Sequence, residues 1–276
     1  ADREMSRELY YECEGHAFDS VIRRDLKVTD EDIDTLCRQM KKVAIANSKS
    51  DLQRAAVKDV TKNVLISWGI LKRSEDGNVY PTNAYVYLTG QGGLRSMIQC
   101  GVFKGTTRAV FLDRRNYEGP LWEQVDEAVK FVLRNIRMGC RLEGVYRQDI
   151  YELPPDSIRE LIVNAIMNCS YIQASNIQVA IYDDRLEVTS PGGLYNGLTY
   201  EEVMKGHSKI RNKLIANIFG QMGLVEAWGS GIRRIISVAG EYGLPVPTVE
   251  VFDDMFRVNL YRNVQHNANG GENSGV

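Results

Sequence analysis

The sequence predicts an α+β protein in which a helical N-terminal region precedes two regions that mix strands and helices. Three observations support this class. Residues 1–80 show helical apolar periodicity behind cap residues, residues 81–150 combine strand-like runs with one amphipathic helix, and residues 151–262 place alternating strands between helices. A chain of 276 residues is long enough for about two domains.

The composition is that of a globular protein and gives no global case for nucleic-acid binding. Hydrophobic residues make up 43% of the chain and charged residues 25%, which allows a sizeable core. The formal net charge is −2, whereas proteins that bind nucleic acid through their overall charge are strongly basic. Small-molecule or protein partners are therefore the simpler expectation.

Cysteine usage and hydropathy predict a cytoplasmic protein without a membrane partner. The five cysteines are scattered and include no C-x-x-C pair, which argues against a disulfide framework or a zinc site. No apolar run reaches membrane-spanning length, and no signal peptide is visible. We therefore expect a reducing compartment.

Both ends of the chain look cut from something longer. The sequence begins with alanine and enters a polar, helix-prone stretch directly. Residues 263–276, "NVQHNANGGENSGV", form a polar tail without a core-forming pattern, and we expect this tail to be disordered.

Two helices are predicted in the N-terminal region. The stretch "TDEDIDTLCRQMKKVA" offers Thr29 or Asp30 as its cap, with acidic residues first and lysines last, as the helix dipole prefers. The stretch "SDLQRAAVKDVTKNVLISWGIL" offers Ser50 or Asp51 as its cap and has Gly69 near its end.

A hairpin turn is predicted after this helix pair, at Asp76-Gly77. A helix pair followed by a hairpin leaves two interpretations of residues 1–80 open. One is a winged-helix reader of DNA, and the other is a subdomain that only packs against the rest of the chain.

The region 81–150 is predicted to link the two ends through α/β structure. The runs "SMIQCGVFKG" and "RAVFLDRRNY" are strand candidates. An amphipathic helix is predicted in "GPLWEQVDEAVKFVLRNI" from one apolar stripe, made of Trp122, Val125, Ala128, Val129 and Val132. The run "RLEGVYRQDIYELP" reads as a strand.

The region 151–262 carries the densest signals. A helix is predicted in "DSIRELIVNAIMNCSY", behind Pro154 and Pro155. Next come two strands joined by a turn at Asp183-Asp184, then two helical segments separated by "WGSG", and a closing hairpin in "TVEVFDDMFRVNLY".

One face of the predicted helix at 156–171 carries a polar row that an ordinary buried helix does not need. Glu160 and Asn164 are four residues apart and project from the same face. A carboxylate there can activate a water, and an amide oxygen is a good Mg²⁺ ligand beside phosphates. The competing interpretations are a solvated helix face and a set of hydrogen bonds that ties loops together.

Two glycine-containing turns accompany this row. The turn "SPGG" lacks side chains where a flat base can approach the backbone, and "GSGI" places free amides at a helix start, where anions are favoured. Each turn by itself is more often only a loop. Their order along the chain, with strands between them, is what indicates a nucleotide site.

The same segments resemble a divergent branch of the GHKL ATPase superfamily, which includes histidine kinases, DNA gyrase B and MutL. The resemblance rests on "ELIVNAIMNCSY", "DDRLEVTSPGGL", "RNKLIANIF", "MGLVEAWGSGIRRI" and "FRVNL", and covers about residues 150–262. The branch is named for the C-terminal region of RecG-like ATP-dependent DNA helicases. It occurs in bacterial transcriptional regulators that carry a Schlafen-type AlbA-like domain upstream. No G-x-x-x-x-G-K-[ST] stretch of a helicase motor is present.

The resemblance implies a C-terminal α/β sandwich of the GHKL (Bergerat) type that binds ATP and Mg²⁺. It implies Glu160 as the water-activating base and Asn164 as the Mg²⁺ ligand. The segment from Leu198 to Asn212 becomes the ATP lid. The further cofactor-binding positions that it implies are Asn168, Ser190, Gly192, Gly193, Lys209, Arg211, Asn212, Gly229, Ser230, Gly231 and Ile232.

This chain departs from the family pattern at three places, one of which is "GSGI", where the second glycine box is usually richer in glycine. Asn168, Cys169 and Ser170 stand where related chains have His, Arg and Asp. The aspartate that reads adenine has no equivalent in "TSPGG", where Ser190 is uncharged and Pro191 lacks an amide N–H.

Three functions follow from this combination. The leading one is a nucleotide-binding regulatory module of a bacterial transcriptional regulator, as a fragment of a longer DNA-binding protein. The expected ligand of this module is ATP or ADP. The alternatives are a Mg²⁺-dependent ATPase associated with DNA transactions and a scaffold that only dimerises or binds partners. Direct DNA contact by this chain is a weaker hypothesis, for which the candidate basic residues are Arg211, Lys213, Arg233 and Arg234.

Overall fold

The computed structural model describes residues 6, 10–11, 17–75, 77–143, 146–225 and 231–263, with side chains outside 140–149. Three predicted features lie wholly or partly outside these residues. They are Asp76 of the first hairpin turn, the "WGSG" turn before Gly231, and the polar tail from residue 264 onward. No helix of the described chain is long and apolar enough to cross a membrane.

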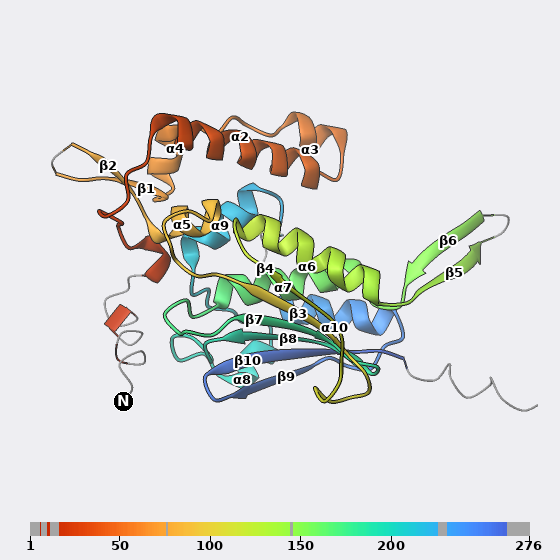
Figure 1. Ribbon diagram of the computed structural model, residues 1–276. Helices are drawn as coiled ribbons and strands as arrows, with labels where there is room; N and C mark the ends of the chain where they lie inside the picture. The colour runs from red at the N-terminus through yellow and green to blue at the C-terminus, as the bar shows by residue number, and fades with distance from the viewer. Residues whose placement is uncertain are drawn as a thin grey trace, which may run out of the picture.

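A six-stranded mixed sheet forms the centre of the fold (Figure 1). Its strand order is β4-β3-β7-β8-β10-β9, and only the β3–β7 pair is parallel. The strands are β3 (Ile98–Phe103), β4 (Phe111–Tyr117), β7 (Ile177–Ile181), β8 (Arg185–Pro191), β9 (Thr248–Phe252) and β10 (Met255–Tyr261). The predicted α+β class is therefore confirmed.

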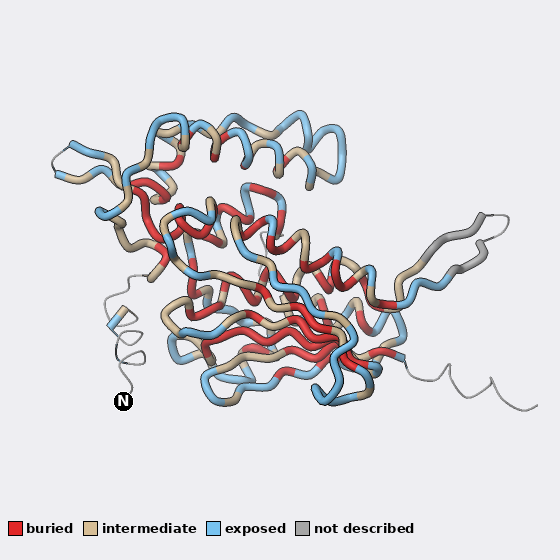
Figure 2. Tube along the Cα trace, in the orientation of Figure 1, coloured by how far each residue is buried: buried red, intermediate tan, exposed pale blue. Residues whose placement is uncertain are grey.

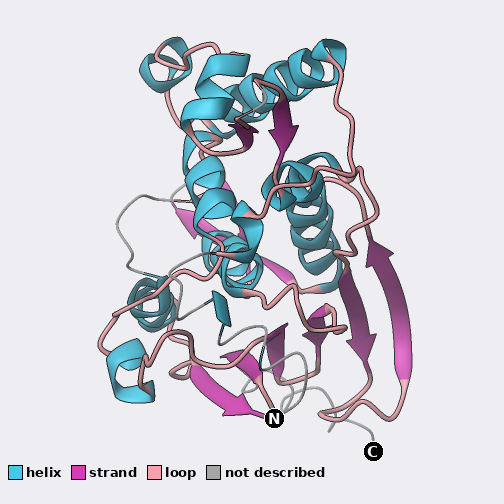
Figure 3. Ribbon diagram, turned by 90° about the vertical axis from the view of Figure 1, so that its left-hand side faces the viewer, coloured by secondary structure: helices cyan, strands magenta, loops and turns pink. Residues whose placement is uncertain are grey.

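Two long helices cover one face of this sheet. They are α6 (Leu121–Asn135) and α7 (Pro155–Asn168), which contact each other and the central strands. The α6 stripe predicted from the sequence is fully buried in the core. In the turned view of Figure 3, most helices gather in the upper part of the molecule and most strands in the lower part.

One apolar core connects the predicted regions. The same cluster of buried side chains runs from Ile33 near the N-terminus to Leu260 in β10. The sheet likewise takes β3 and β4 from the predicted linking region and its other four strands from residues 151–262. The division predicted at residue 150 therefore does not coincide with a break in the sheet or the core.

Residues 30–67, all of them described, form one long helix and two short ones. In α2 (Asp30–Asn47), Thr29 is the cap and forms a capping box with Asp32. The second predicted helix is interrupted, giving α3 (Asp51–Ala55) and α4 (Lys62–Ser67). The single-helix prediction fails because the Thr61 side chain accepts from the Val64 amide and starts a new helix there.

A short hairpin follows α4, as predicted. Strands β1 (Leu71–Arg73) and β2 (Val79–Pro81) pair antiparallel across the glycine turn. Next comes α5 (Asn83–Thr89), in which residues 83–88 are all buried. This helix was not predicted, because its Tyr and Val residues favour strands. In the structure, the tertiary packing of these side chains outweighs that preference.

The N-terminal segment is attached to the helix that follows the predicted lid, α9 (Lys213–Gln221). The Asp19 carboxylate is completely buried, and its Oδ2 accepts from the amides of Leu214 (2.8 Å) and Ile215 (3.1 Å). Asn212, which precedes α9, makes no capping bond with its side chain. Asp19 therefore caps α9 from a position far away in the sequence.

The run "RLEGVYRQDIYELP" forms parts of two strands rather than one. Strands β5 (Met138–Glu143) and β6 (Tyr146–Tyr151) pair with each other and project from the body (Figure 1).

The two remaining C-terminal hairpins agree with the sequence prediction. The β9–β10 turn has Asp253 and Asp254 at positive φ (45° and 57°), as a tight two-residue turn requires.

Candidate functional site

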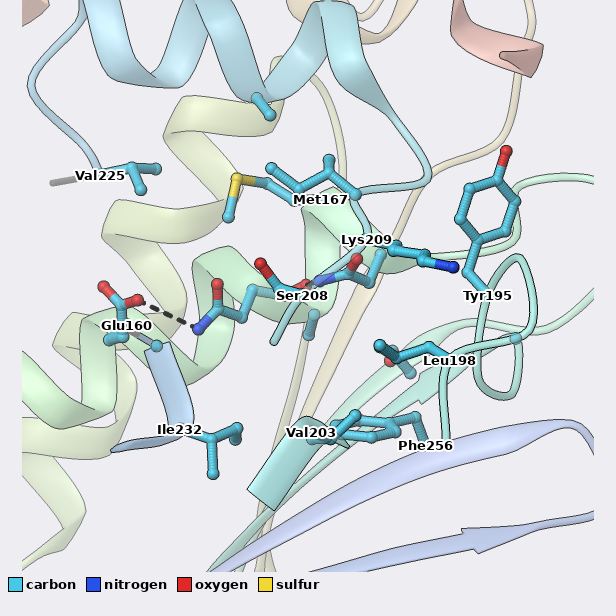
Figure 4. A pocket seen from close by; sticks show the side chains of 18 of the residues that line it. Glu160, Met167, Tyr195, Leu198, Val203, Ser208, Lys209, Val225, Ile232 and Phe256 are labelled. Carbon is cyan, nitrogen blue, oxygen red and sulfur yellow. Dashed lines mark hydrogen bonds between the residues drawn. The ribbon is translucent and has the colours of Figure 1, made fainter. Parts of the chain in front are cut away.

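A pocket of about 580 Å³ lies between α7, the strands β8 and β10, and the helices between these two strands in the chain. Figure 4 shows Glu160 and Ile232 at one side of it and Lys209 and Tyr195 at the opposite side. Of the described residues predicted for the site, nine line this pocket: Glu160, Asn164, Asn168, Ser190, Gly192, Gly193, Lys209, Gly231 and Ile232. Gly229 and Ser230 lie outside the described residues.

The polar row on α7 is linked by hydrogen bonds along the helix. Asn164 donates its Nδ2–H to Glu160 Oε1 over 3.1 Å, and Asn168 donates to the Asn164 carbonyl over 3.0 Å. Because Nδ2 of Asn164 is used, its Oδ1 is the amide atom left to meet a ligand. No described residue donates to that oxygen.

The start of α10 (Gly231–Glu241) lies directly against this row. A Cβ on Gly231 would come within 3.0 Å of Asn164 Nδ2 and 3.5 Å of Glu160 Oε1. A larger residue would thus push into the row, so glycine permits the close approach. The amides at a helix start favour anions. The end of the pocket that attracts anions therefore lies beside the Asn164 amide and the Glu160 carboxylate.

The turn after β8 forms another wall. Gly192 has φ +97°, and its amide donates to the Asp254 carbonyl (2.6 Å) in the β9–β10 turn. Ser190 is only 2% exposed, lines the pocket, and its hydroxyl makes no hydrogen bond with a described residue. It is therefore a polar group available to a ligand on an otherwise apolar floor.

That floor comes from the strands and the lid. Val188 of β8 and Phe256 and Val258 of β10 face the pocket. Val203 also lines the pocket and belongs to α8 (Tyr200–Met204), a short helix inside the predicted lid. An apolar slot of this kind suits a flat aromatic ring.

Two predicted nucleotide contacts, Arg211 and Asn212, do not line the pocket. The Arg211 guanidinium donates to the carbonyls of Asn168 and Gly193, both at 3.1 Å, and its burial lowers its pKa to about 10. The Asn212 amide donates to three carbonyls near the end of α7, those of Ile166, Met167 and Cys169. Both side chains hold the end of the lid segment to α7.

Lys209 lines the pocket from the lid, on the side opposite Glu160. Its Nζ donates to the Asn196 carbonyl over 2.6 Å. The lid keeps its own local order, because Thr199 and Glu202 form a capping box at the start of α8.

The four basic residues considered for DNA contact have separate environments. Arg211 is buried, and Lys213 lines the pocket. The Arg233 stem packs against Gly206 of the lid, and Arg234 lies 3.9 Å from the Asp156 carboxylate. They do not act as one exposed group.

Sequence reasoning missed the contribution of α9 to the pocket. The pocket-facing residues of this helix are Lys213, Ala216, Asn217, Gly220 and Gln221, which lie three or four positions apart. Its other face buries Ile215, Ile218 and Phe219. The sequence already shows this second face opposite the apolar one, but the prediction gave the second face no contact.

The donor set fits a Mg²⁺ ion held mainly by phosphates. The described residues contain no group of three or more His, Cys, Asp or Glu side chains that can hold a metal unaided. Asn164 Oδ1 is free for a cation and lies on the same helix face as the Glu160 carboxylate. Mg²⁺ commonly takes one or two protein oxygens and completes its shell with phosphate oxygens and water.

One protein family matches the part of the chain that forms the strands and the lid beside this pocket. Residues 174–260 match the ATPase-like family described as "Putative ATP-dependent DNA helicase recG C-terminal". The match covers β7 to β10 and the lid, but it begins after Glu160 and Asn164. It supports a nucleotide-binding, ATPase-like module in this part of the chain.

A solved structure shows the same fold. The crystal structure of the DIP2311 protein from Corynebacterium diphtheriae superposes with a TM-score of 0.69 at 21% identity. The alignment covers 94% of this chain and 50% of that one, so this chain spans about half the length of that protein. A search of curated protein sequences found no match.

Proposed function

We propose that this chain is the nucleotide-binding regulatory module of a bacterial transcriptional regulator, and that it binds ATP or ADP with Mg²⁺. The observation that carries the proposal is the meeting of Glu160, Asn164 and the start of α10 at one end of the 580 Å³ pocket. The module would belong to a longer protein that contacts DNA through other domains.

The pocket offers different chemistry at different walls, which suggests how a nucleotide would lie. Phosphates would lie at the α10 start, where backbone amides favour anions. Asn164 Oδ1 would hold Mg²⁺, whose charge would offset that of the phosphates and of Glu160. The base would lie over Phe256 and Val188, with the Ser190 hydroxyl as a hydrogen-bonding partner.

The lid supplies a mechanism for regulation. Its C-terminal end is held to α7 by Arg211 and Asn212, while the Lys209 Nζ donates to the Asn196 carbonyl just before the lid. A nucleotide that binds one lid arrangement better than another shifts the population toward it. Domains joined to this chain would then respond to nucleotide through the lid and α9.

Calorimetric titration of Mg·ATP and Mg·ADP into this chain tests the proposal. We expect a dissociation constant on the order of micromolar, and the loss of binding in Asn164→Ala. Asn135→Ala on α6 is a matched control, since Asn135 also makes a hydrogen bond along its helix but does not line the pocket. Absence of heat at concentrations that reveal a millimolar constant would overturn the proposal in favour of a scaffold without ligand.

A Mg²⁺-dependent ATPase is the second candidate, favoured by the position of Glu160. It is the only carboxylate among the described residues that line the pocket. If it deprotonates water, Glu160→Gln should lower the rate of phosphate release by about 100-fold or more, because an amide is no base. Nucleotide affinity should change little, since the new amide oxygen still accepts from Asn164.

The control for this experiment is Glu123→Gln, an exposed residue on α6 outside the pocket. Equal phosphate release by the Glu160→Gln variant and the unaltered chain would remove Glu160 as the base. If the unaltered chain binds nucleotide without measurable phosphate release, the ATPase function is excluded and the regulatory module is the function that remains.

A further inference from the structure

Strand β4 is an edge of the sheet with an unusually apolar start. Among the described strands it pairs only with β3. Val110, Phe111 and Leu112 lie in succession there and are 50%, 56% and 62% exposed. Figure 2 shows this edge strand as a largely exposed trace beside the buried strands of the sheet. Exposed apolar edges of this kind invite pairing with another strand.

The outward side of the β4 backbone includes an amide that is bonded within the strand itself, and pairing with another strand would replace this bond. The Arg114 amide donates to the neighbouring Asp113 carboxylate over 2.7 Å. An amide bonded in this way is directed away from β3. Because strand residues alternate in direction, Asn116 shares the outward side with Arg114, while Asp113 and Arg115 direct their backbone groups toward β3.

We propose that β4 pairs antiparallel with β4 of a second copy of this chain, so that the two sheets join into one across a two-fold axis at Arg114. In this register Asp113 lies opposite Arg115 of the second copy, and Arg115 lies opposite its Asp113. Both pairs fall at the positions where antiparallel side chains come closest. The strand is thus complementary in charge to itself.

Other registers are less favourable. Centring the axis on Asp113 or on Arg115 sets two like charges opposite each other without forming the two attractive pairs between Asp113 and Arg115. Centring it on Asn116 brings Pro120, which has no amide N–H, opposite Leu112 and leaves the apolar start of the strand without a partner. The Arg114 register keeps Phe111 and Leu112 within the paired segment, opposite Tyr117 and Asn116 of the second copy.

The Arg114 register also contains one unfavourable contact, which makes it testable. The two Arg114 side chains lie opposite each other at the axis. Replacing this residue with an uncharged β-former removes that repulsion. Arg114→Thr should therefore strengthen the dimer, by about threefold or more in dissociation constant.

Sedimentation velocity over a concentration series measures the dimer directly. We expect the unaltered chain to dimerise, and Arg115→Asp to raise the dissociation constant by about tenfold or more, because two attractive pairs become repulsive. The double variant Asp113→Arg/Arg115→Asp exchanges the two charges within each copy and should restore dimerisation. Circular dichroism checks that each variant remains folded.

Val251→Asp is the matched control, because Val251 is 42% exposed on β9, the opposite edge of the same sheet. It should leave the dissociation constant unchanged. A monomeric unaltered chain at all concentrations would overturn the proposal. Dimerisation that survives Arg115→Asp, or is lost with Val251→Asp, would place the contact on another surface and overturn it equally.

Discussion

Replacing Gly192 by alanine is expected to lower the free energy of unfolding by about 2–4 kcal/mol. Gly192 has φ +97°, a conformation that side chains other than glycine adopt only under strain. A Cβ there would also come within 2.9 Å of the Arg211 guanidinium and 3.0 Å of Ser170 Cβ. The substitution therefore adds backbone strain and displaces the arginine that holds the lid. Urea denaturation followed by circular dichroism measures the loss.

Gly193→Ala provides the adjacent control. Gly193 also lines the pocket, but its φ is not positive, and a Cβ would find its nearest neighbours at 3.9 Å. Its free energy of unfolding should stay within about 0.5 kcal/mol of the unaltered value. Equal losses in both variants would show that Gly192 is not specially constrained.

Replacing Asp19 by alanine is expected to lower the free energy of unfolding by about 2–4 kcal/mol. The change leaves the amides of Leu214 and Ile215 without their acceptor at the start of α9. Asp19→Asn keeps one acceptor oxygen in the same place and should retain most of the stability. A loss in Asp19→Asn as large as in Asp19→Ala would contradict a capping role. Urea denaturation at fixed pH compares the three proteins.

The same carboxylate should make stability depend on pH. Burial raises the pKa of Asp19 from 3.8 to about 6, against the lowering effect of its two amide hydrogen bonds and of Lys72 and Lys213. Between these values the folded protein binds more protons than the unfolded chain, so this group favours folding as pH falls from about 6 to 4. The full effect amounts to about 3 kcal/mol.

The proton has a place to bind without breaking the cap. Asp19 Oδ1 has no hydrogen-bond partner among the described residues, whereas Oδ2 accepts both amides. Subtracting the pH profile of Asp19→Asn from that of the unaltered chain isolates this carboxylate from all others. Parallel profiles between pH 4 and 7 would show that Asp19 does not titrate there.

Local sequence signals gave the parts of the fold that depend on neighbouring residues. The Thr29 cap, the α6 stripe and the two C-terminal hairpins are confirmed, because caps, periodicity and turns act over a few residues. The break before Thr61 was missed, although Thr61 is itself a good cap. A cap residue inside a long helical pattern indicates that a second helix can begin there.

Contacts between distant segments were beyond this reasoning. Nothing near Asp19 in the sequence indicates that it caps a helix 195 residues further on. The parallel β3–β7 pair likewise joins strands that local periodicity cannot assign to each other. The pocket floor was missed for a related reason, since Val188 and Phe256 look in the sequence like any strand residues that face a core.

The pairing of β3 with β7 sets a lower limit on the length of chain that can fold on its own. A fragment that starts at residue 151 would keep β7 but lose its neighbour on one side, exposing a row of unpaired backbone groups along an apolar strand. It would also lose α6, which packs along α7 and presses on the same strands. An expression boundary upstream of Ile98 keeps both, so the matched segment 174–260 is a piece of a folding unit and not the whole of one.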